Sequence, residues 1–248
     1  MDTSNIEVEG IVLREFKYKE SSKIIEILTE KIGKISILCK GVLRKNSKNL
    51  TSTLRFSKSR YYIIHSKNMY YLKESFLLNS GKNNFNNLVF KSAICDLILK
   101  TYKVDEKNIY ELVNKYFLAL DESKKNSAYI FLSFLLKYIS FSGYMPSFDK
   151  NLIRNKNKIN DYFIFSISDG KIVSKKDLTS EENVFYLSYN EYVFLYKLLY
   201  TSSEKVCSIN FSGNIKKMLD LIVKFTLTNL EIDSYSSMKW AEKIIETF

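Results

Sequence analysis

Hydrophobic and polar positions alternate along the first eighty residues, which is the period of a β-strand. In the segment from Gly33 to Gly41, one face is apolar and the other carries Lys34, Ser36, Leu38 and Lys40. Similar β-rich runs cover residues 11–18, 23–29, 60–66 and 69–76. A hairpin turn is predicted at Lys67-Asn68, between the last two runs. Five short strands predict a small barrel, for which the five-stranded OB-type barrel is the usual oligonucleotide-binding form.

After Gly81 the hydrophobic period becomes that of an α-helix. Residues 109–120 carry a continuous apolar stripe, with Asp105 as a candidate N-cap. Comparable stripes predict helices near residues 90–101, 215–226 and 238–247, and the aromatic run 185–196 is also predicted to be helical. The segment from Ile130 to Phe141 is apolar almost throughout, so it is predicted to be a central helix, and Gly143 and Pro146 end it.

Two further patterns define the predicted organisation. Residues 162–173 return to the strand period, with a hairpin signal at Asp169-Gly170. The polar run GKNNFNN, which starts at Gly81, marks the boundary between the two halves of the chain. The fold class is therefore α+β: an N-terminal five-stranded barrel over residues 1–80, then a mainly helical domain over 81–248 with a small β-hairpin insert at about 147–177.

Composition argues against several chemistries. The chain has one histidine, His65, and three scattered cysteines without a CxxC pair, so neither a histidine-rich site nor a zinc ribbon is expected. Seven glycines supply no glycine-rich phosphate loop. The adjacent acid pairs at 105–106, 121–122 and 181–182 are interpreted as helix-start or surface charges. We expect no enzyme, no metal, no signal peptide and a cytoplasmic location.

Charge changes the picture, because the formal net charge is +11. Eleven basic side chains and no acid occur over the forty-three residues between Glu30 and Glu74. Four tyrosines lie within this run, at positions 61, 62, 70 and 71. Cations neutralise phosphates and aromatic faces stack on unpaired bases, so the run predicts nucleic-acid binding. The alternative is a solvated basic surface with the tyrosines packed inside the barrel. A basic run on strands does not suggest a membrane-surface helix.

Several N-terminal motifs resemble those of one family. GIVL occupies residues 10–13, Tyr18 begins the segment YKESS, and TEKIGKISILCKG covers residues 29–41, followed by Arg44-Lys45 and Ser47. The segment GYMP at residues 143–146 resembles that family's turn after a central helix. In order and spacing these motifs resemble RecO, the bacterial recombination mediator.

The resemblance implies an N-terminal OB domain and a largely helical C-terminal domain. It also implies binding of single- and double-stranded DNA, annealing of complementary strands, and no nucleotide cofactor. The implied partners are RecR, the acidic C-terminal tail of the single-stranded DNA-binding protein, and the recombinase RecA, in the bacterial cytoplasm at the nucleoid. Many family members hold zinc after the GY.P turn. Here the first cysteine pair would fall at Asn151 and Arg154, so no structural zinc is expected.

The predicted DNA-binding residues lie on the barrel and on the loop after its third strand. The lysines and arginines of this set are expected to contact phosphates, and its tyrosine is expected to stack on a base. The set consists of Lys34, Lys40, Arg44, Lys45, Lys48, Arg60 and Tyr62. A competing hypothesis makes the chain a partner-docking scaffold whose helical domain binds a protein tail and whose nucleic-acid affinity is incidental. The residues themselves indicate only a polyanionic ligand and do not distinguish DNA from RNA.

Overall fold

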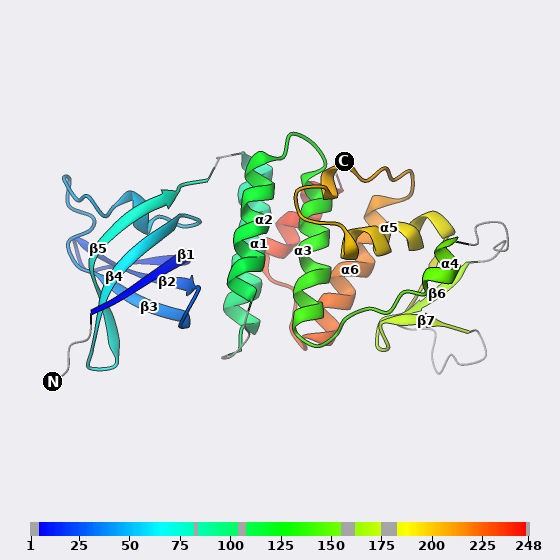
Figure 1. Ribbon diagram of the computed structural model, residues 1–248, viewed down its shortest axis with the longest axis horizontal. Helices are drawn as coiled ribbons and strands as arrows, with labels where there is room; N and C mark the ends of the chain where they lie inside the picture. The colour runs from blue at the N-terminus through cyan, green and yellow to red at the C-terminus, as the bar shows by residue number, and fades with distance from the viewer. Residues whose placement is uncertain (1–4, 82–83, 104–107, 155–161, 175–182, 247–248) are drawn as a thin grey trace. The chain divides into compact units, whose positions relative to one another are not determined.

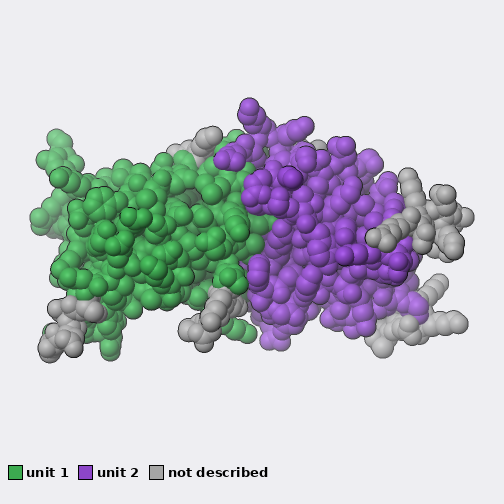
Figure 2. Space-filling view, viewed as in Figure 1, with its two compact units in different colours: residues 1–121 green, residues 122–248 purple. Residues whose placement is uncertain are grey.

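The computed structural model describes residues 5–81, 84–103, 108–154, 162–174 and 183–246 of the chain. It divides into two compact units, residues 1–121 and residues 122–248 (Figure 2). The first unit therefore contains more than the predicted barrel, because two helices that follow the barrel belong to it.

Five strands close the predicted barrel (Figure 1). The strands are β1 (Asn5–Tyr18), β2 (Ser22–Thr29), β3 (Gly33–Cys39), β4 (Lys58–Ser66) and β5 (Met69–Asn79). Their order is β1-β2-β3-β5-β4, with β4 paired back to β1 and a parallel contact between β3 and β5. The OB-type barrel is confirmed. Strand β1 begins before the predicted Ile11 because Asn5 to Gly10 pair with β4, a long-range partner that local alternation does not reveal.

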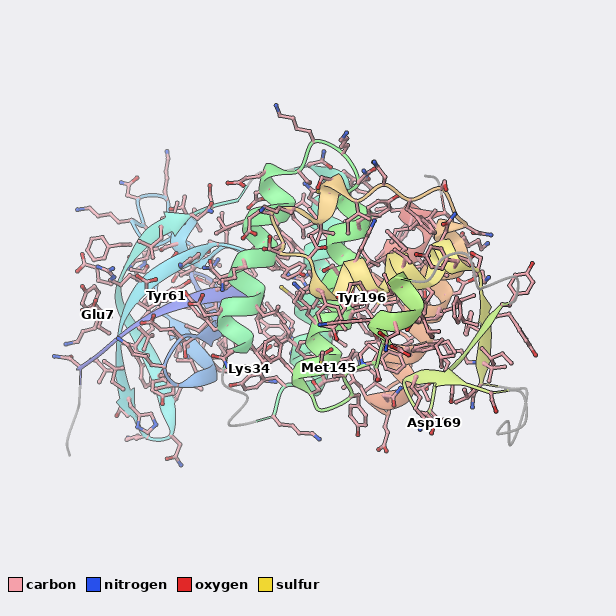
Figure 3. All side chains as sticks on the ribbon, turned by 45° about the vertical axis from the view of Figure 1, so that its right-hand side comes forward. Glu7, Lys34, Tyr61, Met145, Asp169 and Tyr196 are labelled. Atoms are coloured by element: carbon pink, nitrogen blue, oxygen red, sulfur yellow. The ribbon has the colours of Figure 1, made fainter. Side chains whose placement is uncertain are left out.

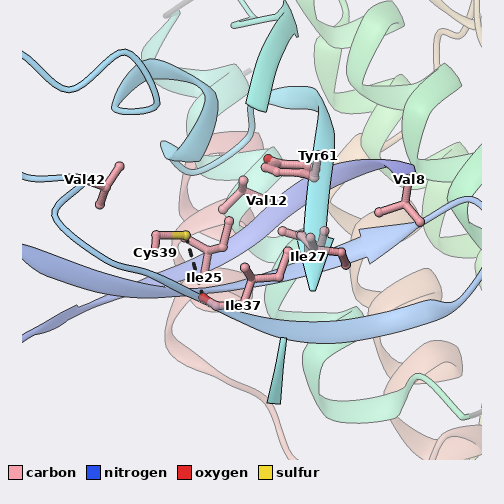
Figure 4. Packing of buried hydrophobic residues seen from close by; sticks show 9 residues of the cluster. Val8, Val12, Ile25, Ile27, Ile37, Cys39, Val42 and Tyr61 are labelled. Atoms are coloured by element: carbon pink, nitrogen blue, oxygen red, sulfur yellow. Dashed lines mark hydrogen bonds between the residues drawn. The ribbon is translucent and has the colours of Figure 1, made fainter. Parts of the chain in front are cut away.

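The barrel interior is filled by one apolar cluster. Val8, Val12, Ile25, Ile27 and Ile37 are almost completely buried and belong to this cluster together with Cys39, Val42, Tyr61 and Ile63. Figure 4 shows Val12, Ile25 and Tyr61 pointing toward one another inside the barrel. Burial raises the pKa of the Cys39 thiol to about 12, which makes it an unreactive core residue. The side chains that alternate with these along each strand lie on the outer face.

Helices α1 (Phe85–Thr101) and α2 (Ile109–Glu122) pack in the same unit as the barrel. The side chain of Asn84 accepts a hydrogen bond from Asn86 N and caps α1. A buried ion pair joins the two helices, with Lys91 Nζ 2.5 Å from Asp121 Oδ1. The predicted N-cap Asp105 lies outside the described residues. Arg55 connects the barrel to α1 through a 2.8 Å bond to Asp96.

The second unit is built on α3 (Ser127–Phe141), whose residues are buried almost throughout. Packed against it are α5 (Tyr189–Tyr200), α6 (Ile215–Asn229) and the short 3-10 turn Val206–Ser208. Helix α7 (Ser236–Ile245) packs on α6, and α4 (Lys150–Arg154) is a single turn. The predicted central helix is confirmed, and Gly143 follows its end with φ +98°.

A three-stranded antiparallel sheet completes this unit. It consists of β6 (Phe163–Ser166), β7 (Lys171–Val173) and β8 (Val184–Leu187) in the order β7-β6-β8. The predicted hairpin at Asp169-Gly170 is confirmed, with Gly170 at φ +62°. The prediction of one helix over 185–196 is wrong at its start, because Phe185 pairs with Phe165 and α5 begins only after the Ser188 capping box. No helix among the described residues is long and apolar enough to cross a membrane.

Candidate nucleic-acid interface

The basic loop, residues 40–48, follows β3 and is held against the β1–β2 hairpin. Gly41 N donates a 3.1 Å hydrogen bond to Ser22 Oγ, and Leu43 N donates a 2.9 Å bond to Ser21 O. Val42, between them, is only 2 % exposed and belongs to the barrel core. These anchors fix the start of the loop although most of its side chains face solvent.

Four predicted phosphate-binding residues come together on this loop. Their side chains are exposed, and within the described part of the chain none of them forms an ion pair: Lys40, Arg44, Lys45 and Lys48. A cluster of exposed cations that forms no ion pair with a described carboxylate creates a positive potential that attracts phosphate groups. Lys40 Nζ also lies 5.0 Å above the ring centroid of Tyr71, which places one aromatic ring beside the cluster.

A buried group of hydroxyls holds the chain that follows the basic loop. The carbonyl oxygen of Ser52 accepts hydrogen bonds from Tyr61 OH at 2.7 Å and from Ser57 Oγ and Ser59 Oγ at 3.0 Å. Asn49 Oδ1 accepts from the backbone N of Ser75 on β5 at 3.1 Å. The loop is thus attached to the barrel at both ends, so its cations are presented by a supported backbone.

Lys34 is placed differently from the loop cations. Its side chain is half-buried, and Nζ donates a 3.0 Å hydrogen bond to the carbonyl oxygen of Leu99 near the end of α1. Figure 3 labels Lys34 on the side of the barrel next to the helices. A cation at a helix C-terminus satisfies a free carbonyl and the helix dipole. This arrangement gives Lys34 a structural partner that the sequence did not reveal.

Arg60 and Tyr62 lie on an acid-lined part of the barrel. Arg60 contacts Glu9 at 3.0 Å and Glu7 at 3.4 Å, and Glu7 is the direct cross-strand neighbour of Tyr62. The hydrogen bond from Arg60 holds the pKa of Glu9 below its usual value, so this carboxylate is charged at neutral pH. On the other side of Tyr62, β5 supplies Glu74. The surroundings of these two predicted residues are therefore far less positive than the basic loop.

The acid-free run of the sequence is interrupted in space by carboxylates from other segments. Arg55 pairs with Asp96 at 2.8 Å, and Lys58 lies 3.5 Å from Glu9. Among the four tyrosines of the run, Tyr61 is fully buried, while Tyr70 packs against the core and lies beside His65. Charge segregation along the chain therefore overstates the positive surface, whereas the four cations of the basic loop form no ion pair with a described carboxylate.

Sequence reasoning passed over two exposed aromatic residues at the end of β1. Phe16 is 45 % exposed and Tyr18 is 40 % exposed, and both share the outer face with Arg14. They lie before Glu30 and so outside the acid-free run. The signal that could have found them was the two-residue spacing of Arg14, Phe16 and Tyr18, which puts one cation and two aromatic rings on one face of the strand.

The insert near α4 does not fit the zinc that the family resemblance raised. Asn151 and Arg154 occupy the sequence positions where the first cysteine pair would fall, and neither residue type supplies the thiolate of a structural zinc site. In the described residues, no three His, Cys, Asp or Glu side chains are grouped to hold a metal ion.

Comparison with known families agrees with this architecture. A family model described as "Recombination protein O N terminal" matches residues 1–80, and one described as "Recombination protein O C terminal" matches residues 82–237. The chain belongs to the RecO family. The N-terminal match covers the barrel, so the basic loop lies within the first of the two RecO regions.

Curated RecO proteins resemble the chain over nearly its whole length. DNA repair protein RecO of Caldanaerobacter subterraneus subsp. tengcongensis is 30 % identical, with 96 % of this chain and 98 % of the relative covered. DNA repair protein RecO of Clostridium novyi is 27 % identical, with 94 % of each covered. That of Clostridium perfringens is 26 % identical over 91 % of this chain and 92 % of the relative. The chain is thus a DNA repair protein of the RecO family.

Proposed function

We propose that this chain is a DNA-binding recombination mediator that binds single- and double-stranded DNA through the basic loop. The observation that carries the proposal is the group of four exposed cations, Lys40, Arg44, Lys45 and Lys48, on a loop attached to the barrel at both ends. In this proposal they contact phosphates, while Lys34 supports α1 and Arg60 and Tyr62 contribute less, because carboxylates surround them.

Annealing follows from the same contacts. A protein that neutralises the phosphates of two strands lowers their mutual repulsion, and it promotes pairing when it leaves the Watson–Crick edges of the bases free. No step of this process requires a nucleotide or metal. We further propose that the chain acts with RecR, with the acidic tail of a single-stranded DNA-binding protein and in loading the recombinase RecA.

The test is a fluorescence anisotropy titration of a labelled single strand and a duplex at several salt concentrations. Replacement of Arg44, Lys45 and Lys48 by alanine is expected to weaken binding to all sequences alike. The slope of log K against log salt should fall by roughly one unit for each phosphate that the variant no longer neutralises. A matched control removes three exposed lysines of the second unit, Lys171, Lys205 and Lys239, which changes the net charge equally.

Three outcomes separate the hypotheses. Loss of affinity and salt slope in the loop variant alone supports DNA binding at the basic loop. Equal losses in both variants mean that only net charge matters, and the loop assignment is then wrong. No binding by the unmodified chain at low salt contradicts the mediator proposal and favours the partner-docking scaffold.

A further inference from the structure

The outer face of the barrel carries a row of apolar side chains that crosses four strands. Phe16 on β1 pairs with Ile24 on β2, Ile24 pairs with Leu38 on β3, and Leu38 pairs with Tyr71 on β5. Directly paired residues point to the same face of a sheet, so these four side chains form one continuous row. We call them the outer row.

The outer row faces away from the barrel core. Its members alternate along each strand with core residues such as Ile25 and Ile37. Phe16 is 45 % exposed, whereas Ile24 and Tyr71 are half-buried and Leu38 lies between them at 7 %. The row therefore has an accessible aromatic ring near each end and a closed apolar floor between them.

Positive charges lie directly above both rings. The guanidinium carbon of Arg14 is 4.7 Å from the centroid of Phe16, and Lys40 Nζ is 5.0 Å from that of Tyr71. Glu26, on the same face, is already paired with Arg14 at 2.7 Å. A ring next to a cation matches a nucleotide, which offers a flat base for the ring and a phosphate for the cation.

We infer that the outer row is a base-stacking platform for single-stranded nucleic acid, with Phe16 and Tyr71 as the stacking residues and Lys40, which forms no ion pair with a described carboxylate, as the phosphate partner beside Tyr71. This inference rests on the proposed function, because the basic loop that begins at Lys40 would guide the backbone to the row. Three strand spacings of about 4.8 Å put the two rings roughly 14 Å apart along the sheet. An oligonucleotide spanning the row therefore contacts both rings at non-adjacent bases.

A stacking platform suits strand annealing. A ring takes up the flat face of a base and leaves its hydrogen-bonding edge uncovered, so a stacked strand can still pair with its complement. A duplex offers no unstacked base to the rings. Stacking therefore adds affinity for single strands only, whereas the phosphate contacts of the basic loop serve both forms.

The experiment compares an oligothymidylate of about twelve nucleotides with an abasic oligomer of equal length and charge. The unmodified protein is expected to bind the base-bearing strand about a hundred-fold more tightly, since each of the two stacked bases contributes about ten-fold in affinity. Phe16→Leu and Tyr71→Leu should each reduce that ratio. Affinity for the abasic oligomer and the salt slope should stay unchanged, because both substitutions keep every cation.

Phe76→Leu is the matched control. Phe76 is 50 % exposed on β5, but it packs against Tyr62 and lies outside the outer row. Equal binding of the two oligomers by the unmodified protein, or equal losses in Phe76→Leu and in the row variants, would overturn the stacking platform while leaving phosphate binding intact. Binding of neither oligomer would instead contradict the proposed function. The comparison between oligomers needs no variant, so it holds even if a substitution prevents folding.

Discussion

The hydroxyl of Tyr61 donates a 2.7 Å hydrogen bond to the carbonyl oxygen of Ser52 from inside the barrel core. Tyr61 is fully buried on β4, and Ser52 belongs to the short 3-10 turn that follows the basic loop. The bond therefore connects the barrel core with the turn that directly follows the basic loop. Burial raises the pKa of this phenol, so the hydroxyl stays protonated and remains a donor at all physiological pH values.

Tyr61→Phe should lower the free energy of unfolding by about 1 kcal/mol, since one buried hydrogen bond is lost with little change in shape. The loss is moderate because Ser57 and Ser59 still donate to the Ser52 carbonyl. Urea denaturation measures it. Tyr62→Phe, at a half-buried neighbour, serves as the control with an expected change within about 0.5 kcal/mol. Equal effects at both positions would contradict the role of the Ser52 bond.

The stability that Glu9 provides should depend on pH. Its pKa in the folded chain lies below the usual 4.5, first because of the Arg60 hydrogen bond. A lowered pKa means that the contribution is present above about pH 4.5 and is lost as the pH falls through the folded-state value. Glu9→Gln should therefore be less stable than the unmodified chain at pH 7, by up to about 1 kcal/mol.

The Glu9→Gln variant also tests whether the negative charge of Glu9 neutralises Arg60. Thermal unfolding followed at pH 7 and pH 3 should show a larger difference between the variant and the unmodified chain at pH 7 than at pH 3. A difference of the same size at both pH values would mean that Glu9 acts through packing rather than charge. In the DNA titration, Glu9→Gln should strengthen binding, because it leaves Arg60 with less carboxylate compensation.

Lys34→Met should reduce stability and leave DNA affinity nearly unchanged. The ammonium group of Lys34 is bound to the Leu99 carbonyl, and a cation at a helix C-terminus contributes about 0.3–1 kcal/mol. Lys40→Met is the comparison, because Lys40 is exposed and is expected to contact phosphate. If Lys34→Met lowers the salt slope as much as Lys40→Met does, then Lys34 contacts DNA as the sequence predicted.

Substitution of one partner in the buried ion pair between α1 and α2 should strongly lower the free energy of unfolding. Lys91 is 1 % exposed, and Lys91→Met would remove the cation that lies 2.5 Å from the Asp121 carboxylate. Such a change costs about 3–5 kcal/mol. The double variant Lys91→Met/Asp121→Leu should recover much of this loss, because the buried negative charge is removed as well. Calorimetric unfolding compares the stability of the single and the double variant. If the double variant is no more stable than Lys91→Met, the buried charge of Asp121 does not explain the loss of stability.

The barrel could be predicted from the sequence because its strands alternate locally and its turns carry their own signals. Lys67 and Asn68, predicted as the hairpin turn, both adopt positive φ, as tight hairpin turns require. The prediction that Phe185 starts a helix is wrong because the local sequence carries no decisive signal there. An apolar run of that length fits a strand or a helix, and its pairing with β6 decides between them.

The candidate site depended more on long-range register than the barrel did. The sequence indicated the cations of the basic loop, because they lie close together in the chain. It did not indicate that Glu9 reaches Arg60, fifty-one residues away. The outer row was also hidden, since Phe16 and Tyr71 become parts of one surface only through three successive strand pairings.

The parallel contact between β3 and β5 has a consequence for the order of folding. It consists of Ile37 with Tyr70 and Leu38 with Tyr71, and about thirty residues separate the paired positions along the chain. The hairpins β1–β2 and β4–β5 close much shorter loops, so they can form early. The β1–β4 pairing joins residues still further apart in the chain, but seven residue pairs hold it, against two at the β3–β5 contact, which is therefore the weaker closure. We therefore expect the β3–β5 contact to form last during folding and to open first during unfolding. In a barrel whose β3–β5 contact is open, Leu38 and Tyr71 are no longer paired. The last folding step is then the one that joins Tyr71 to the rest of the outer row.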